Sequence, residues 1–226
     1  LPGRAPGLHL SDQGREQAEQ VAARIAALAG VTADGDGRGG CDGAASANGR
    51  TARAGRSTRR KVKGGGGQKI TAVYASPLER TRETAAPIAR VLGHVVAVDD
   101  GLVEVDVGEW TGLELKAARK RKEWATIQRY PSGFTFPGGE SFVTMQARIV
   151  DTLARLRAAH PGETVVAVSH ADPIRAAVAH AMGTHLDLFQ RVVVSPCSVT
   201  AIAYGAEGPV VLTVNDTAAT GALVPS

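Results

Sequence analysis

Cysteine and long apolar runs are scarce in this sequence of 226 residues. Its two cysteines, Cys41 and Cys197, are far apart and have neither the spacing of a metal site nor that of a redox pair. No stretch approaches the roughly 20 consecutive apolar residues that a membrane-spanning helix needs. These absences argue against a disulfide framework and a membrane span. We therefore expect a cytoplasmic protein without a membrane partner.

Positive charge is concentrated in one segment. The chain has a net charge of +4 and a pI near 9.3. Nine basic and three acidic residues lie between Asp34 and Lys69, so this stretch carries +6 and the rest of the chain −2. The surrounding segment, about 31–69, is rich in Gly, Ala, Ser and Arg and almost free of large apolar side chains. Such a composition cannot bury enough surface to fold, which predicts a disordered insertion.

Two interpretations of this basic insertion stay open. It could act as an arm that tethers the protein to nucleic acid, because clustered positive charge binds phosphate backbones non-specifically. It could also be a tolerated surface insertion without a role. We favour the second interpretation and expect no nucleic-acid partner, since the insertion has no aromatic side chain to stack on bases.

On either side of the insertion, strand patterns alternate with helix patterns. Helices are expected within 10–30, 77–93, 114–128, 140–159 and 171–183, and strands at 70–76, 95–98, 164–168, 198–204 and 209–215. The last two strands should form a hairpin across Gly205–Gly208. Alternation of this kind is typical of an α/β sandwich, with a mostly parallel central sheet and helices on both faces. We expect one domain over 1–226.

Candidate functional residues follow two of the expected strands. The first strand ends at Ser76, with Arg80 about one helical turn later, and the other ends at Ser169 and His170. Asp172 is expected to cap the helix after His170. Ligands bind beyond the carboxyl ends of parallel strands, and a helix N-terminus there favours an anion. An arginine and a histidine at neighbouring strand ends would complete an anion cradle.

Each residue also has a purely structural interpretation. His170 could be a hydrogen-bonded core histidine, and Arg80 a solvated surface charge with Arg82 as its competitor. Segment 102–112, "LVEVDVGEWTG", could be an edge strand whose acids, Glu104 among them, point outward. No single element decides between structure and function.

The order of five motifs along the chain is more informative about fold and function than any single motif. The pieces are "LHLSDQGREQA", "YASPLERTRETA", "LVEVDVGEWTG", "FPGGES" and "VVAVSHADPIR". In this order the sequence resembles the histidine phosphatase superfamily, in its phosphoglycerate mutase-like branch. The resemblance covers nearly the whole chain except the insertion. It implies phosphoryl transfer from a small phosphorylated metabolite through a phosphohistidine, without a metal or cofactor. We expect a phosphatase rather than a mutase, because no basic cluster outside the insertion could be assigned to the closed pocket of a mutase.

The resemblance also assigns roles residue by residue. Arg80 matches the phosphate-binding arginine, and His170 matches the second histidine, which binds the phosphoryl group. Glu104 matches the carboxylate that protonates the leaving oxygen and then activates water. Ala171 would donate a backbone N–H to the phosphoryl group, and Gly3 falls in a loop that helps to enclose the substrate.

One part of the family pattern is missing from this sequence. The family's nucleophilic histidine lies in an Arg-His-Gly signature after the first strand, and this sequence starts inside the loop that follows it. No other histidine replaces the nucleophile. We therefore expect an N-terminally truncated sequence that lacks the first strand and is inactive by itself. The alternative is a catalytically inactive module that binds phosphorylated ligands through Arg80 and His170.

Overall fold

The computed structural model describes residues 1–31 and 69–217. The expected disordered insertion thus falls almost entirely outside the described residues. The α-helices are α1 (Asp12–Leu28), α2 (Glu79–Leu92), α3 (Leu115–Ala118), α4 (Trp124–Arg129), α5 (Phe142–Ala159) and α6 (Ala171–Ala181). Short 3₁₀ turns are η1 (Asp100–Leu102), η2 (Gly108–Trp110), η3 (Pro131–Gly133) and η4 (Leu186–Arg191). Among these helices, none is long and apolar enough to cross a membrane.

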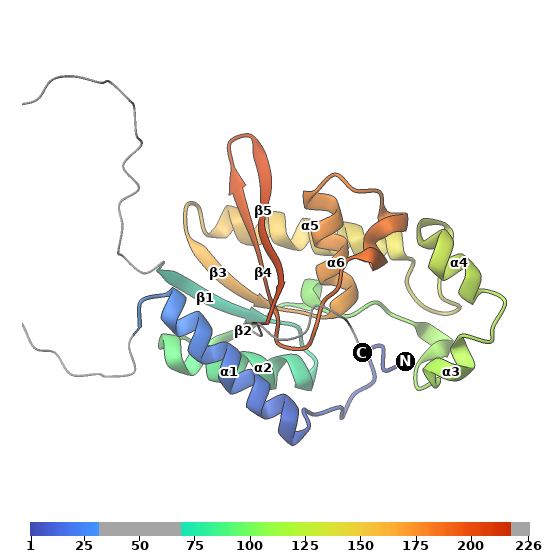
Figure 1. The fold of residues 1–226 in the computed structure, drawn as a ribbon, viewed down its shortest axis with the longest axis horizontal. Coiled ribbons are helices and arrows are strands. Elements are labelled where there is room, and N and C mark those ends of the chain that lie inside the picture. Colours follow the sequence, from blue (N-terminus) through green and yellow to red (C-terminus); the bar gives the residue numbers. More distant parts are fainter. Residues whose placement is uncertain (32–68, 218–226) are drawn as a thin grey trace, which may run out of the picture.

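Three parallel strands form the central sheet (Figure 1). They are β1 (Ile70–Ala75), β2 (Val96–Val98) and β3 (Thr164–Val168), in the order β2-β1-β3. Val73 of β1 lies opposite Val96 on one side and Val166 on the other. The expected parallel sheet is therefore confirmed, and its middle strand is the one that ends at Ser76.

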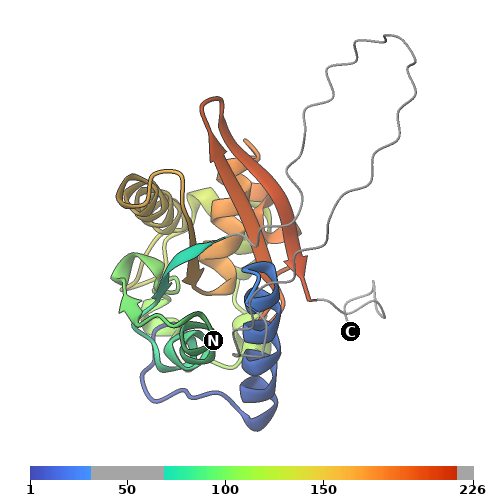
Figure 2. The ribbon, with the colours of Figure 1, turned by 90° about the vertical axis from the view of Figure 1, so that its left-hand side faces the viewer.

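Alternation along β1 explains the layers on the two faces of the sheet. Successive side chains of a strand point to opposite faces. Val73 and Ala75 pack on α1 and α2, with Val21 among their buried neighbours, whereas Tyr74 packs against the core beside α5 and α6. Figures 1 and 2 show these helices on both sides of the strands, with α1 and α2 packed together. The result is the expected α/β sandwich.

The last two strands form a separate antiparallel hairpin. They are β4 (Val199–Gly205) and β5 (Gly208–Asp216), and Gly205 pairs with Gly208 at the turn, as the sequence predicts. The hairpin contacts α6. Several of its apolar side chains are exposed, Val210 and Leu212 most of all.

Three local expectations differ from the structure. The single helix expected over 114–128 is two short helices, α3 and α4, joined by a turn. Segment 102–112 is not an edge strand: it runs from the end of η1 through the irregular residues 103–107 to η2 and the turn after it. Asp172 does not cap α6: His170 is the N-cap residue and has no side-chain capping bond, while the Asp172 carboxylate accepts from Arg175 (3.0 Å).

Candidate active site

The candidate site lies where β1 and β3 end. Ser76 follows β1, and its backbone N–H donates to the carbonyl of Val168 at the end of β3 (3.0 Å). The Ser76 hydroxyl lies 2.8 Å from Nε2 of His170, and both side chains are buried. The Ser169 hydroxyl donates to the carbonyl of Leu102 (2.7 Å), which ties the end of β3 to η1. Three chain segments therefore meet at one edge of the sheet; the sequence predicts the meeting of the two strand ends but not their contact with Leu102.

His170 is held as a neutral imidazole in a positive field. Burial, together with the weaker effect of the positive charges of Arg80, Arg148 and Arg4, lowers its pKa to about 3. The side chain therefore carries no proton charge near pH 7. Positive charges that disfavour an imidazolium also favour a bound anion, and the anion would in turn raise the pKa of His170. The surroundings of His170 would therefore favour a bound anion.

Arg80 has a buried donor without a partner. It lies in the first turn of α2, where Nη2 donates to the carbonyl of Gly3 (3.0 Å). Nη1 is buried and has no hydrogen-bond partner among the described residues. Burial lowers the pKa of this guanidinium, an effect that the negative charge of Glu104 opposes. An unsatisfied buried donor costs free energy, and a phosphate oxygen would satisfy it. Arg82, the competing candidate, is exposed.

Glu104 follows η1 and is partly buried. Its Oε1 accepts from the backbone N–H of Val105 (2.9 Å). Burial and, after it, the negative charge of Asp172 raise the pKa of Glu104 to about 8, against the opposing effects of the Val105 N–H and of Arg80. At neutral pH the carboxyl therefore holds a proton that it can donate.

Ala171 and Gly3 take different places around these three side chains. Ala171 is the first residue of α6, where a backbone N–H has no acceptor within the helix. Gly3 has φ +48°, and a Cβ there would come 2.6 Å from Val107 Cγ2. Its carbonyl accepts from Arg80, so Gly3 positions that guanidinium. Contact of either residue with a substrate stays a prediction.

Two further arginines and a glutamate fix the backbone of Glu104, and sequence reasoning missed all three. Arg148 on α5 forks onto the Glu140 carboxylate, with Nε and Nη2 at 3.0 and 2.9 Å, and its Nη1 donates to the Val103 carbonyl (2.8 Å). Arg4 donates to the Glu104 carbonyl (2.8 Å) and also to Glu140 (2.9 Å). No local pattern marks Arg148, because its partners come from distant parts of the chain. Glu140 did lie within a recognised motif, "FPGGES".

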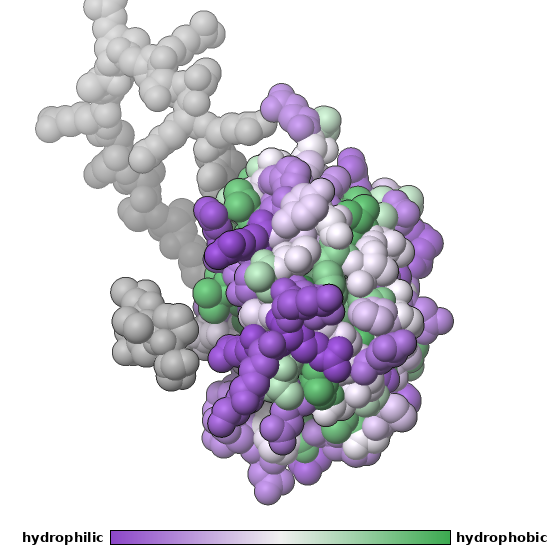
Figure 3. All heavy atoms as spheres, turned by 90° about the vertical axis from the view of Figure 1, so that its right-hand side faces the viewer, coloured by the Kyte–Doolittle hydropathy of each residue, from purple (hydrophilic) through white to green (hydrophobic). Residues whose placement is uncertain are grey.

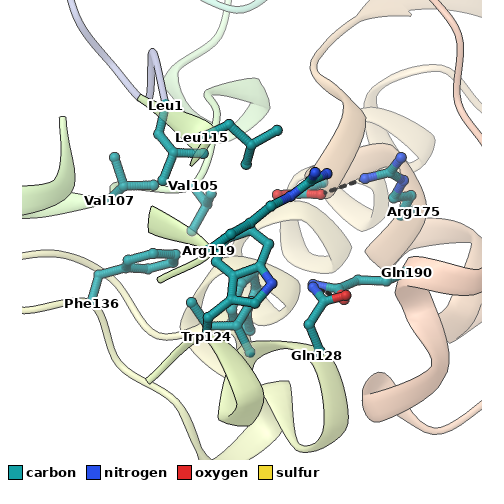
Figure 4. Close-up of a pocket in the computed structure, with 13 residues that line it drawn as sticks. Leu1, Val105, Val107, Leu115, Arg119, Trp124, Gln128, Phe136, Arg175 and Gln190 are labelled. Atoms are coloured by element: carbon teal, nitrogen blue, oxygen red, sulfur yellow. Dashed lines mark hydrogen bonds and ion pairs between the residues drawn. The ribbon is translucent and has the colours of Figure 1, made fainter. Parts of the chain in front are cut away.

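A cavity of about 380 Å³ opens beside the site (Figure 4). Val105, next to Glu104, and Asp172, two residues after His170, both line it. The other lining residues come mainly from α3, α4 and the segments around them; they are Leu1, Val107, Leu115, Arg119, Trp124, Ile127, Gln128, Phe136, Phe142, Arg175 and Gln190. Chain neighbours of Glu104 and His170 therefore line the cavity, while Arg80, Glu104 and His170 themselves do not.

His170 is the one histidine at the site among the six in the chain, all of which lie in the described ranges. His9 pairs with Glu83 near the surface, and His160 contacts Tyr74. The rest lie at the end of α2, in the last turn of α6 and at the start of η4; they are His94, His180 and His185. Within 1–31 and 69–217, no cluster of three His, Cys, Asp or Glu side chains could hold a metal ion.

Sequence comparison finds relatives that share part of their length with this chain. The bifunctional protein Rv2228c of Mycobacterium tuberculosis is 36% identical over 140 residues, which are 62% of this chain and 38% of that protein. Phosphoserine phosphatase 1 of Hydrogenobacter thermophilus is 32% identical over 124 residues, 54% of this chain and 59% of that enzyme. The matched region thus spans well under two thirds of these curated relatives.

Comparison with solved structures supports the fold. The mycobacterial glucosyl-3-phosphoglycerate phosphatase Rv2419c superposes with a TM-score of 0.70 and 20% identity, over 96% of this chain and 91% of that one. A phosphoserine phosphatase variant from Entamoeba histolytica gives 0.71 and 18%, over 96% and 88%. The family model of the histidine phosphatase superfamily (branch 1) matches residues 51–217. This chain therefore belongs to the histidine phosphatase superfamily.

Proposed function

We propose that this site carries out phosphoryl transfer from a small phosphorylated metabolite, in the direction of a phosphatase. The observation that carries the proposal is the pairing of a buried, neutral His170 with an unpartnered Arg80 Nη1 at adjoining strand ends. A phosphate oxygen would accept from the free Arg80 Nη1 donor, and the charge of a dianion would favour a proton on His170. The relatives named above for phosphoserine and glucosyl-3-phosphoglycerate support phosphomonoesters as the substrate class.

The proposed roles follow from the positions of the side chains. Arg80, His170 and the N–H of Ala171 bind the equatorial oxygens of the phosphoryl group and stabilise their charge in the transition state. Glu104 gives its proton to the leaving alkoxide as the P–O bond breaks and an N–P bond to a nucleophilic histidine forms. In the second step water attacks phosphorus, the N–P bond breaks, and Glu104 takes the proton of the water.

The nucleophile in this scheme is a second histidine, and none of the other five is at the site. We therefore expect the 226-residue chain to bind phosphate without turning over a phosphomonoester, since loss of a nucleophile costs about 10⁶-fold in rate. Turnover of p-nitrophenyl phosphate that disappears in His170→Ala would contradict this expectation.

A second candidate function is that of a phospho-ligand-binding module without catalysis. This function is favoured by the absence of a second histidine at the site among the six in the chain, because binding needs only Arg80 and His170. A raised Glu104 pKa argues for catalysis, since a binding module has no use for a proton donor at neutral pH. The nucleic-acid tether rests on the basic insertion, which lies outside the described residues.

Titration of the chain with orthovanadate tests the phosphate site. We expect saturable binding by the 226-residue protein, weakened at least tenfold in His170→Ala, because the variant loses a group in contact with the anion. His185→Ala, which changes an exposed histidine at the start of η4, should bind as the parent does. Equal binding by all three proteins would overturn the proposal.

A further inference from the structure

The cavity beside the site has an apolar floor. Val105, Val107, Ile127, Phe136 and Phe142 line it, and all five side chains are buried. Trp124 of α4 forms a partly exposed wall (Figure 4). A volume of about 380 Å³ accommodates a group of the size of a substituted aromatic ring. The floor therefore suits an apolar body better than a polyol or a sugar, whose hydroxyl groups would find no partners there.

The mouth of this cavity is positively charged. Arg119 is exposed and lines the cavity, and no described residue forms a hydrogen bond or an ion pair with its guanidinium. Arg175, the other lining arginine, is already neutralised by Asp172 at 3.0 Å. Figure 3 shows hydrophilic side chains gathered on this side of the molecule, and the run 116–122, in α3 and the turn after it, contains five basic residues. Arg119 is thus the lining cation free to meet a ligand.

Two residues that line the cavity are chain neighbours of the phosphoryl site, and one of them, Asp172, interacts electrostatically with Glu104. Val105 follows Glu104, which would protonate the leaving oxygen, and Asp172 lies one residue after Ala171. A phosphomonoester with its phosphoryl group on Arg80 and His170 would therefore direct its alcohol portion toward the apolar floor and its far end toward Arg119.

From this arrangement we infer the substrate class: phosphomonoesters whose alcohol has an apolar, ring-sized body and a negatively charged group at its far end. This inference rests on the proposed function, since it assumes that the phosphoryl group sits on Arg80 and His170. Trp124 and Arg119 are the specificity-determining residues.

Three phosphonates test this inference by calorimetric titration of the 226-residue chain, because phosphonates need no turnover. Methylphosphonate fills only the phosphoryl site, phenylphosphonate adds the apolar body, and 4-phosphonobenzoate adds the negative far end. We expect phenylphosphonate to bind about tenfold more tightly than methylphosphonate, from burial of the ring. The benzoate should gain about a further fivefold from Arg119.

Variants separate the two contributions. Trp124→Ala should abolish the advantage of phenylphosphonate and leave methylphosphonate binding unchanged; Leu115→Ala, which removes an exposed lining side chain, tests the same point if the tryptophan variant does not fold. Arg119→Gln should abolish the advantage of the benzoate. Lys122→Gln removes the same charge outside the lining and should keep that advantage.

The two possible failures are distinguishable. The substrate class would be overturned if the three phosphonates bind with equal affinity. It would also be overturned if Trp124→Ala and Arg119→Gln keep the higher affinities for the larger phosphonates. Neither result would contradict the phosphoryl site. No binding of any of the three, methylphosphonate included, would overturn the proposed phosphoryl site and this inference with it.

Discussion

At the scale of single residues, the site is set by opposite pKa shifts in two side chains. Burial makes both His170 and Glu104 prefer their neutral forms, so the pKa of the base falls and that of the acid rises. The histidine can gain a proton when an anion binds, and the glutamic acid has one to give. Both shifts suit the roles proposed for these residues in phosphoryl transfer.

Anion binding should raise the pKa of His170 and take up protons. We expect sulfate, which stays a dianion across this range, to bind more tightly as pH falls from 8 to 5, by up to about tenfold per unit. Calorimetry in buffers of different ionisation enthalpy should show proton uptake, and His170→Gln should take up fewer protons. Binding without uptake would show that His170 does not face the anion.

Glu104→Gln should stabilise the protein above pH 5. The folded pKa of Glu104 is about 8, well above its ordinary 4.5, so the unfolded chain releases this proton first and stability falls as pH rises between these values. The glutamine variant has no ionisable group at this position and therefore lacks this decrease in stability. Its advantage in unfolding free energy should grow by about 3 kcal/mol from pH 5 to pH 8, measured by urea denaturation. Glu109→Gln, an exposed acid of the same segment, should show no such trend.

At the scale of elements, the segment between η1 and η2 has no strand or helix of its own. It is held by the Arg148–Glu140–Arg4 network and by close backbone contact with 137–140. The N–H of Glu140 donates to the Asp106 carbonyl (2.8 Å). Only glycine fits at 139, because a Cβ there would lie 2.4 Å from the same carbonyl oxygen. The motif "FPGGES" thus supports the segment that carries Glu104.

Arg148→Lys should destabilise the protein by about 2–3 kcal/mol, because lysine keeps the charge but cannot make the forked bonds to Glu140 and the loop carbonyls. Thermal unfolding measures the change. Arg155→Lys on the same helix is the matched control: the Arg155 side chain is 58% exposed, although its partner Asp99 is only 9% exposed, and the loss should be about 1 kcal/mol or less. Similar losses in both variants would contradict a special role for Arg148.

The sequence predicts the elements near the site better than the contacts that hold them. Strand endings at Ser76 and His170 follow from β-rich runs that stop at polar residues, and Gly93 ends α2 in the left-handed conformation expected of glycine. Local sequence patterns do not predict the contacts of Arg148, because its partners lie in segments that only the fold brings together. Asp172 fits a capping pattern, yet the pair with Arg175 takes its carboxylate.

At the scale of the whole molecule, the parallel sheet places the site and the cavity on one edge. Ser76 follows β1 and His170 lies just after β3. Arg80 lies on α2, and Glu104 lies in the segment after η1. Because these groups come from four separate parts of the chain, a bound anion should stabilise the fold as a unit. The thermal midpoint should rise with orthovanadate concentration, and no rise at saturation would contradict the site.

The central claim is that Arg80 and His170 form an anion site, and a pair of neighbouring arginines tests it most directly. Both Arg80 and Arg82 lie on α2, but only Arg80 is turned into the site, whereas Arg82 is exposed. The measurement is the affinity of the 226-residue chain for inorganic phosphate by calorimetry. Arg80→Ala should weaken binding by at least tenfold and Arg82→Ala should leave it unchanged. Equal affinities in the two variants would contradict the claim.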